Sequence, residues 1–447
     1  MQAMRNTALR EPGRGAERLA KLLATVFFRR VEVAGAEHVP AQGPLLFVAN
    51  HGNSLVDPLL LLARMPRRAR FLAKHTLWHN PALRPLMDLA AAIPVYRRQD
   101  GAEGGSNDET FSMCFEVLRA GGAIALFPEG ISYHAPGLQP LKTGAARIAL
   151  GAQRADLRIV PVGLTFEDKA IFRSRALLVV GPALDPAPEL ELAARDEREA
   201  VRQLTARIEA ALRTVTLNFA SFDESEVVER VADLFAEATH VMPGEAELGA
   251  RFPLRHALGA GYAQARAREP QRVARVEALV REYDELLEGS GLRDDQVSAR
   301  YPVGLAAHYV GTRALWLAFA LPIAVIGTVL CYVPYRVPGL VAHLAGRHRD
   351  LPATYKILCG LALAPLWFAL LGALAWALAG PWAALAIVVA APLTGWYALL
   401  FHERNDSFWR EVGAWLVLRL FPGRAAKLRR LRAEIRREVE RLAAEPR

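Results

Sequence analysis

Cysteine is scarce in this sequence, where only Cys114, Cys331 and Cys359 occur among 447 residues. The three lie far apart, and no pair has the spacing of a zinc site or of a disulfide framework. A chain with so few thiols fits a reducing compartment. Cys114 lies inside a helical pattern, so we expect it to be a core residue and not a nucleophile.

Sequence signals of several other protein classes are also missing. No Gly-x-Ser-x-Gly elbow occurs, which argues against a serine acyl-enzyme. His51, His75 and His79 are near one another, but no carboxylates accompany them at metal-ligand spacing, and we expect neither a metal nor another cofactor. We find no nucleic-acid motif and no basic stripe interleaved with aromatic residues, so no nucleic-acid partner is expected.

The first residues carry no recognisable secretory signal. The apolar stretch Leu19 to Phe28 is too short to span a bilayer and lacks a small-residue cleavage site. Residues Ala16 to Phe28, which include this stretch, have the periodicity of a short amphipathic helix.

What the sequence does contain is a mixture of apolar and basic residues. Hydrophobic residues make up 52% of the chain, while charged residues still make up 23%. This mixture predicts a soluble part and a membrane part. The formal net charge of +9 favours anionic partners such as lipid headgroups, phosphates and CoA.

Short apolar runs alternate with helical patterns over the first half of the chain. Such runs, bounded by Gly and Pro, predict buried strands, and the periodic segments between them predict helices. This alternation indicates an α/β domain at roughly residues 16–220. The mixed apolar and basic stretch Arg67 to Met87 is expected to be helical, either an interfacial helix beside the site or an ordinary domain helix. The expected strands are 31–33, 44–49, 93–96, 123–127, 159–165 and 176–181, and the other expected helices are 59–64, 109–120 and 144–154.

The composition changes along the second half of the chain. Residues 221–310 are predicted to form a charged helical extension, and residues 311–403 a helical membrane domain with three long apolar runs. Residues 404–447 are predicted to be a basic amphipathic tail whose apolar face lies on an anionic leaflet. The apolar runs are Ala314 to Tyr332, Ile357 to Ala379 and Trp382 to Phe401, and the apolar face of the tail consists of Leu428, Leu431, Ile435 and Val439.

The charges around the apolar runs predict how the chain crosses the membrane. The loop between the first two runs and the tail from Arg424 to Arg437 are basic, and both should be cytoplasmic by the positive-inside rule. The α/β domain at residues 16–220 is expected on the same side. We therefore predict two crossings and one embedded element that does not span, with the first run interrupted near Pro322. Three straight spans are the alternative that hydropathy alone supports.

A histidine and an aspartate flank a turn in the segment Asn50-His51-Gly52-Asn53-Ser54-Leu55-Val56-Asp57-Pro58. His51 ends a predicted strand, and Asp57 begins a predicted helix as its cap. A carboxylate that accepts from one ring nitrogen would leave the other as a base, which suits removal of a proton from an alcohol. A capping aspartate beside an ordinary loop histidine explains the same pattern, so this motif alone leaves both open.

Three further segments suggest a phosphate site and an apolar groove. Ile93 to Arg98 is a predicted strand that ends in Arg97 and Arg98, and guanidinium groups suit a phosphate monoester. In Phe127-Pro128-Glu129-Gly130, the carboxylate could bind the acceptor hydroxyl or hold the arginines, and Gly130 permits close approach of a ligand. Lys142 precedes a predicted helix start, where an anion is favoured. Ile159 to Phe166 is an apolar strand with an internal Pro that could shape the groove. Each segment alone is also compatible with a solvated turn or an edge strand.

These four segments, in this order and spacing, resemble the glycerophospholipid acyltransferase superfamily, which includes lysophosphatidate and glycerol-3-phosphate acyltransferases. The resemblance covers roughly residues 40–185. The family usually has four residues between the His and the Asp, whereas this chain has five. The five-residue form, with Phe172-Arg173-Ser174-Arg175-Ala176, resembles the fungal-type glycerol-3-phosphate/dihydroxyacetone-phosphate branch.

The resemblance implies an α/β acyltransferase domain with a mixed sheet flanked by helices. Together with the apolar runs and the basic regions, it predicts an integral protein of the inner, cytoplasmic membrane. Its catalytic domain should face the cytoplasm, because a thioester donor is made there. It implies that His51 is the general base and Asp57 its partner. The implied substrate-binding residues are Asn53, Arg97, Arg98, Glu129, Gly130 and Lys142. The implied partners are membrane lipids, a phosphorylated glycerol acceptor and an acyl-CoA or acyl-carrier-protein donor, with no metal and no covalent intermediate. Two alternatives stay open: a lysophosphatidate acyltransferase, and a non-catalytic lipid-binding protein on the same fold.

Overall fold

A computed structural model describes residues 12–81, 83–96, 107–235, 247–298, 303–345 and 351–444. The chain divides into two compact units. Unit 1 comprises Met1–Phe222, Glu247–His256 and Gly346–Thr354, and unit 2 comprises Asp223–Ala246, Ala257–Ala345 and Tyr355–Arg447.

Unit 1 is built on a seven-stranded sheet with the order β1-β7-β6-β2-β5-β3-β4. Neighbouring strands are parallel except β6 and β7, which are antiparallel. The predicted mixed sheet in an α/β domain is therefore confirmed. The strands are β1 (Arg30–Ala34), β2 (Leu45–Ala49), β3 (Arg70–Lys74), β4 (Ile93–Val95), β5 (Ala123–Leu126), β6 (Arg158–Phe166) and β7 (Arg175–Val180).

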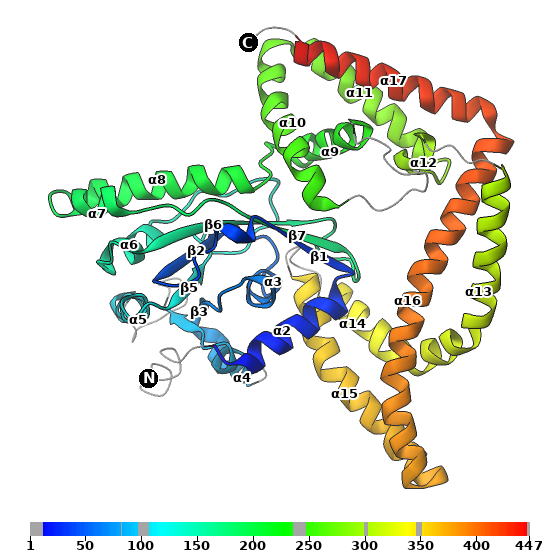
Figure 1. Ribbon diagram of the computed structural model, residues 1–447, viewed down its shortest axis with the longest axis horizontal. Coiled ribbons are helices and arrows are strands. Elements are labelled where there is room, and N and C mark those ends of the chain that lie inside the picture. The colour runs from blue at the N-terminus through cyan, green and yellow to red at the C-terminus, as the bar shows by residue number, and fades with distance from the viewer. Residues whose placement is uncertain are drawn as a thin grey trace. The chain divides into compact units, whose positions relative to one another are not determined.

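Helices cover both faces of this sheet. Successive strand residues point to opposite faces, and Leu46 and Val48 of β2 face a core shared with α5 (Asn107–Arg119), α6 (Gly144–Gly151) and α8 (Glu197–Val215). On the other face, α2 (Arg14–Phe27) packs against α3 (Val56–Arg64) (Figure 1). The shorter helices of unit 1 are η1 (Ala36–His38), η2 (His75–His79), α4 (Arg84–Leu89) and α7 (Ala187–Ala193).

The helix expected over residues 67–87 is wrong. Residues Arg70–Lys74 form β3, which pairs with β5 on one side and β4 on the other. The short helices η2 and α4 follow it. Backbone pairing on two sides outweighs the local amphipathic pattern, which is a weak guide when tertiary contacts decide.

Unit 2 is helical, as predicted for the second half of the chain. Its helices are α9 (Phe222–Phe235), α10 (Leu248–Arg268), α11 (Pro270–Glu288), α12 (Asp294–Ser298), α13 (Val303–Leu330), α14 (Tyr332–Leu344), α15 (Pro352–Ala379), α16 (Pro381–Leu420) and α17 (Pro422–Ala444). The first residues of α9, α10 and α15 belong to unit 1. The predicted domain boundary at residue 403 falls inside α16, and the domain limits otherwise stay predictions.

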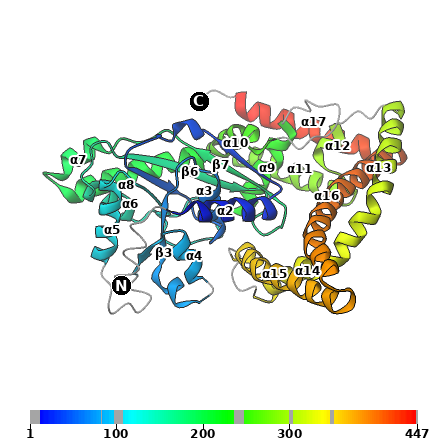
Figure 2. The ribbon, with the colours of Figure 1, turned by 60° about the horizontal axis from the view of Figure 1, so that its bottom comes forward.

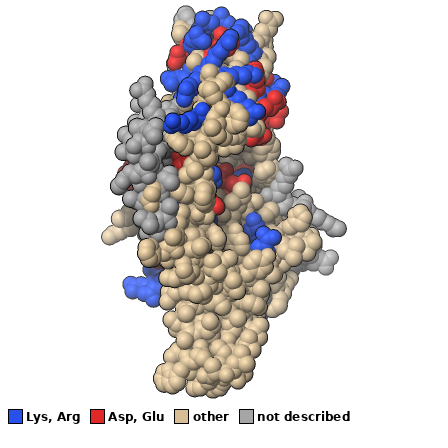
Figure 3. Space-filling view, turned by 90° about the vertical axis from the view of Figure 1, so that its right-hand side faces the viewer, with Lys and Arg blue, Asp and Glu red and all other residues tan. Residues whose placement is uncertain are grey.

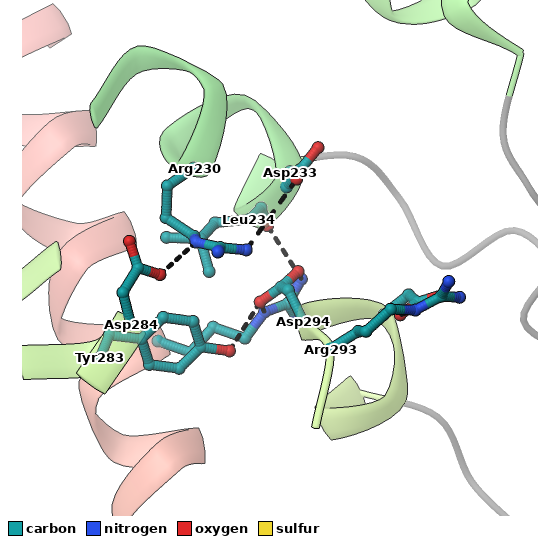
Figure 4. A network of polar contacts seen from close by, with 9 residues as sticks. Arg230, Asp233, Leu234, Tyr283, Asp284, Arg293 and Asp294 are labelled. Carbon is teal, nitrogen blue, oxygen red and sulfur yellow. Dashed lines mark hydrogen bonds and ion pairs between the residues drawn. The ribbon is translucent and has the colours of Figure 1, made fainter. Parts of the chain in front are cut away.

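The basic helix α17 does not offer its apolar face to a membrane surface, so that prediction is wrong. Leu428 and Ile435 are completely buried in a core shared with α11, α9 and α12. Arg432 reaches into the same region and forms an ion pair with the buried Asp294, which also accepts a hydrogen bond from Tyr283 at 2.6 Å (Figure 4). Sequence periodicity identified the apolar face correctly but could not distinguish lipid from protein as its partner.

Two helices of unit 2 are long and apolar enough to cross a membrane. These are α15 and α16, and Leu366, Trp376 and Trp382 are largely exposed on them. On the face over α13 and α16, the Lys and Arg side chains gather at the end with α17, and the surface below is almost free of charge (Figure 3). This distribution fits a membrane segment with a basic border.

Helix α13, which contains most of the first apolar run, forms a bent pair with the following helix α14. Helix α13 continues through Pro322, and the chain bends by 53° at Cys331, where α14 begins. The interruption is therefore nine residues beyond the predicted one. Helix α13 lies along α16, and Gly327 allows it to touch the backbone of Thr394 (Figure 2).

Packing within unit 2 bears on the number of crossings. Helix α11 precedes all the apolar runs and α17 follows them, yet the two pack together. Both must therefore lie on the same side of a membrane, which requires an even number of crossings. The packing favours the predicted pair of crossings over three straight spans.

Candidate active site

The site lies where neighbouring parallel strands end. Strands β6, β2 and β5 are adjacent and parallel, so their carboxyl ends meet at one edge of the sheet. His51 follows β2, Glu129 follows β5 and Lys169 follows β6. Ligands of open α/β sheets bind at this edge.

His51 and Asp57 form the pair that the sequence predicts. Nδ1 of His51 lies 2.8 Å from Oδ2 of Asp57, whose side chain is completely buried in the first turn of α3. An ionised carboxylate only accepts hydrogen bonds, so Nδ1 carries the proton and Nε2 remains a base. The imidazole is 18% exposed and stacks on Phe127 with ring centroids 4.1 Å apart. This pair is partly accessible yet fixed in orientation.

Asp57 does not cap α3, contrary to the prediction. The N-cap is Leu55, and Oδ2 of Asp57 instead accepts a second hydrogen bond, from the backbone N–H of Asn53 at 2.8 Å. Its Oδ1 is buried and accepts no hydrogen bond from a described residue. The carboxylate therefore holds both the histidine and the turn that leads to it.

Ser54 lies in the turn between His51 and Asp57 and has an uncommon backbone conformation. Its φ is +41°, in the left-handed region that residues other than Gly seldom adopt. Asn53, predicted to bind substrate, is 1% exposed, and its amide donates to the carbonyl of Lys169 at 3.2 Å. This placement favours a positioning role for Asn53.

Glu129 is also held inside the domain. Its side chain is 5% exposed, and its two oxygens accept from the backbone N–H groups of His51 at 2.6 Å and Gln139 at 3.0 Å. Burial raises the pKa of Glu129, and these two hydrogen bonds oppose the shift. The carboxylate thus positions the end of β2 that carries His51, and acceptor binding by Glu129 stays a prediction.

Two protein families match this chain. Residues 30–165 match the family described as Acyltransferase, and residues 244–445 match the Glycerol-3-phosphate acyltransferase 2 C-terminal domain. Residues 30–165 are an acyltransferase-family domain. The resemblance inferred from the four motifs is confirmed, and the second match covers a region in which the sequence showed no chemistry.

Curated proteins similar to this chain include yeast and human acyltransferases. Glycerol-3-phosphate O-acyltransferase 2 of Saccharomyces cerevisiae is 30% identical over 288 residues, which cover 60% of this chain and 38% of that protein. Glycerol-3-phosphate O-acyltransferase 1 of the same yeast is 23% identical over 76% of this chain and 58% of that protein. The human 1-acyl-sn-glycerol-3-phosphate acyltransferase alpha is 33% identical over 30% of this chain and 44% of that protein.

The chain spans between 38% and 66% of the length of the first curated relatives that it matches. A solved 1-acyl-sn-glycerophosphate acyltransferase from Thermotoga maritima is 20% identical, with a TM-score of 0.35, and the match covers 45% of this chain and 77% of that one.

Two lysine side chains lie over glycines of the candidate site. Gly130 has a φ of +83°, and a Cβ added there would lie 2.6 Å from Nζ of the exposed Lys142. The glycine thus allows the lysine to lie over the turn that follows β5. Arg97 and Arg98 lie outside the described residues, but β4 ends at the same edge of the sheet as β5.

Lys169 is a site residue that the sequence reasoning missed. A Cβ added at Gly52, next to His51, would lie 2.8 Å from Nζ of Lys169. The available signal was its position, a cation three residues beyond the end of β6. The apolar pattern of residues 159–166 predicts a groove and gives no indication of a cation after it.

Cys114 is fully buried, and burial raises the pKa of its thiol to about 12, so it is a core residue as expected. Within the described ranges, no group of His, Cys, Asp and Glu side chains is placed to hold a metal ion.

Proposed function

We propose that this protein transfers a fatty acyl group from acyl-CoA or acyl-carrier protein to the hydroxyl of glycerol-3-phosphate or dihydroxyacetone phosphate in phospholipid synthesis. The observation that carries the proposal is the His51–Asp57 pair, 2.8 Å apart at the carboxyl edge of the sheet. The yeast relatives named for glycerol-3-phosphate acylation support this choice of acceptor.

The reaction proceeds by direct attack. Nε2 of His51 takes the proton of the acceptor hydroxyl while the oxygen attacks the thioester carbonyl. The new C–O bond forms, the C–S bond breaks, and the imidazolium returns the proton to the leaving thiolate. Asp57 stabilises the imidazolium through the hydrogen bond to Nδ1. The step balances without a metal and without a covalent enzyme intermediate.

Cationic side chains would bind the phosphate of the acceptor. Lys142 and Lys169 lie over the two glycines that follow Glu129 and His51. Arg97 and Arg98 follow β4 in the sequence, and guanidinium groups bind phosphate through paired hydrogen bonds. We assign phosphate binding to this set, with Asn53 and Glu129 supporting the turn beneath it.

The product of this reaction is a lipid, and the chain has helices suited to a membrane. Helices α15 and α16 would anchor the protein in the inner, cytoplasmic membrane, with the acyltransferase domain facing the cytoplasm. This orientation gives His51 access to a thioester donor made in the cytoplasm.

The test is acyl transfer by protein purified in detergent. Labelled acyl-CoA and acyl-carrier protein are each incubated with glycerol-3-phosphate, dihydroxyacetone phosphate and 1-acylglycerol-3-phosphate, and the lipids are separated. We expect product with one of the first two acceptors, and a loss of roughly a hundredfold to ten-thousandfold in His51→Ala. Wild-type turnover in His51→Ala would refute the mechanism.

One second function has specific support. The human 1-acyl-sn-glycerol-3-phosphate acyltransferase alpha is 33% identical over 137 residues, so the lyso-lipid is the alternative acceptor. Product formed only from 1-acylglycerol-3-phosphate would replace the proposed reaction with that one. No product from any acceptor would favour a non-catalytic lipid-binding protein.

A further inference from the structure

The turn between His51 and Asp57 has an unusual support. Three successive backbone N–H groups, those of Asn53, Ser54 and Leu55, lie in the turn that ends at Leu55, the N-cap of α3. Each of the three donates to a side-chain oxygen. The turn is therefore held by these side chains in addition to its own backbone hydrogen bond, from the N–H of Val56 to the carbonyl of Asn53 at 2.9 Å.

One of the three acceptors belongs to the turn itself, and the other two come from distant parts of the sequence. Asn53 donates to Oδ2 of Asp57 at 2.8 Å, and Ser54 donates to Oγ of Ser132 at 3.1 Å. Leu55 donates to Oγ1 of Thr354 at 3.3 Å, across 299 positions of the chain. Support from outside is needed here, because Ser54 occupies the left-handed region at φ +41°.

Thr354 is well placed to act as this support. It lies in the first turn of α15, within the segment Gly346–Thr354 that belongs to unit 1, and the neighbouring Ala353 is completely buried. Threonines inside the apolar helices behave differently: the hydroxyls of Thr328 and Thr394 donate to carbonyls four residues back in their own helices. At Thr354 no helical carbonyl lies four residues back, since α15 begins at Pro352.

We propose that Thr354 is a positioning residue for acyl transfer. Its hydroxyl holds the His51–Asp57 turn in the geometry that the additional residue would otherwise loosen. The inference rests on the proposed function for its kinetic part, and on the hydrogen bond alone for its structural part. Through it, the start of a candidate membrane helix takes part in ordering the catalytic pair.

The kinetic test compares Thr354→Val, which keeps the shape and removes the hydroxyl, with Thr354→Ser, which keeps the hydroxyl. We expect kcat to fall about threefold to tenfold in the valine variant, with the KM values for both substrates within about twofold of wild type. The serine variant should recover most of kcat. Thr394→Val is the matched control and should behave as wild type, because that hydroxyl bonds only its own helix.

A second measurement tests the contact without any activity. Hydrogen exchange of the detergent-purified protein should show a faster amide at Leu55 in Thr354→Val and an unchanged one in Thr354→Ser. Unchanged exchange and unchanged kcat in the valine variant would overturn the inference. An inactive wild type with all acceptors would refute the proposed function, while the exchange of the Leu55 amide would still decide whether Thr354 holds the turn.

Discussion

Replacement of Asp57 by Asn separates the charge of this residue from its shape. Oδ2 of Asp57 accepts from both Nδ1 of His51 and the N–H of Asn53. An asparagine must place its carbonyl oxygen there, because its NH₂ group would face two donors. The correct histidine tautomer is therefore retained, and only the negative charge beside the imidazolium is lost.

The expected magnitude follows from that loss. A hydrogen bond to a charged group contributes more than a neutral one by about 1–1.5 kcal/mol, so kcat should fall roughly tenfold. This loss of kcat is smaller than the loss expected for His51→Ala, which removes the general base and should cost roughly a hundredfold to ten-thousandfold. The NH₂ group of Asn would occupy the buried position of Oδ1, which no described residue contacts by a hydrogen bond. We therefore also expect a destabilisation of about 1–3 kcal/mol.

The assay is acyl transfer at saturating substrates, with each variant normalised to folded protein by its thermal melt in detergent. In the double variant His51→Ala/Asp57→Asn, the loss should match that of His51→Ala alone, since Asp57 acts through His51. Glu189→Gln is a suitable control, because this buried carboxylate pairs with Arg207 away from the site. Wild-type kcat in Asp57→Asn, or a loss as large as that of His51→Ala, would refute the reasoning.

Three other predictions address the phosphate, the fold and the membrane. Arg97→Ala should raise the KM of the phosphorylated acceptor more than that of acyl-CoA, since a lost charge-assisted pair costs about 1.5–3 kcal/mol; an unchanged acceptor KM would assign the phosphate to other cations. Burial raises the pKa of Glu167, but the hydrogen bond and charge of Arg175 outweigh it and lower the pKa below 4.5. The stability that this pair contributes is thus present above pH 4.5 and is lost as the pH falls through the pKa of Glu167 in the folded protein. The melting temperatures of wild type and Glu167→Gln should therefore converge in acid, and a constant difference between them would contradict this prediction. Cysteines placed near residues 300 and 440 should both resist an impermeant thiol reagent in sealed cells, and labelling of only one would contradict two crossings.

Much of unit 1 was predictable because its signals are local. Strands β2 and β5 are short apolar runs bounded by turn residues, and the His51–Asp57 pair follows from the strand–turn–helix order. Strand β3 was missed because it forms by pairing on both sides, which no local pattern encodes. The position of the bend in the first apolar run was misplaced for a related reason: Pro322 is tolerated inside α13.

The roles of individual polar groups were harder to predict than their presence. Glu129 was identified as a site residue, but its partners are backbone N–H groups, whose positions depend on how residues 129–139 fold. Thr354 carries no sequence signal, since its partner lies 299 positions away. The burial of Leu428 required knowledge of α11, because the same amphipathic face suits a lipid surface or a helix.

The packing of α17 on α11 also sets an order for biosynthesis. The sheet of unit 1 is complete once the ribosome has made the chain through β7, at Val180. The core around Tyr283 stays open much longer, because Leu428 and Arg432, which fill and neutralise it, are made only after both candidate membrane helices. During that interval Asp294 lacks its cation and an apolar face lacks its cover, so the nascent protein is exposed to proteases and chaperones at this point. The helices before α15 can therefore complete their folding only after α15 and α16 have been made and inserted into the membrane.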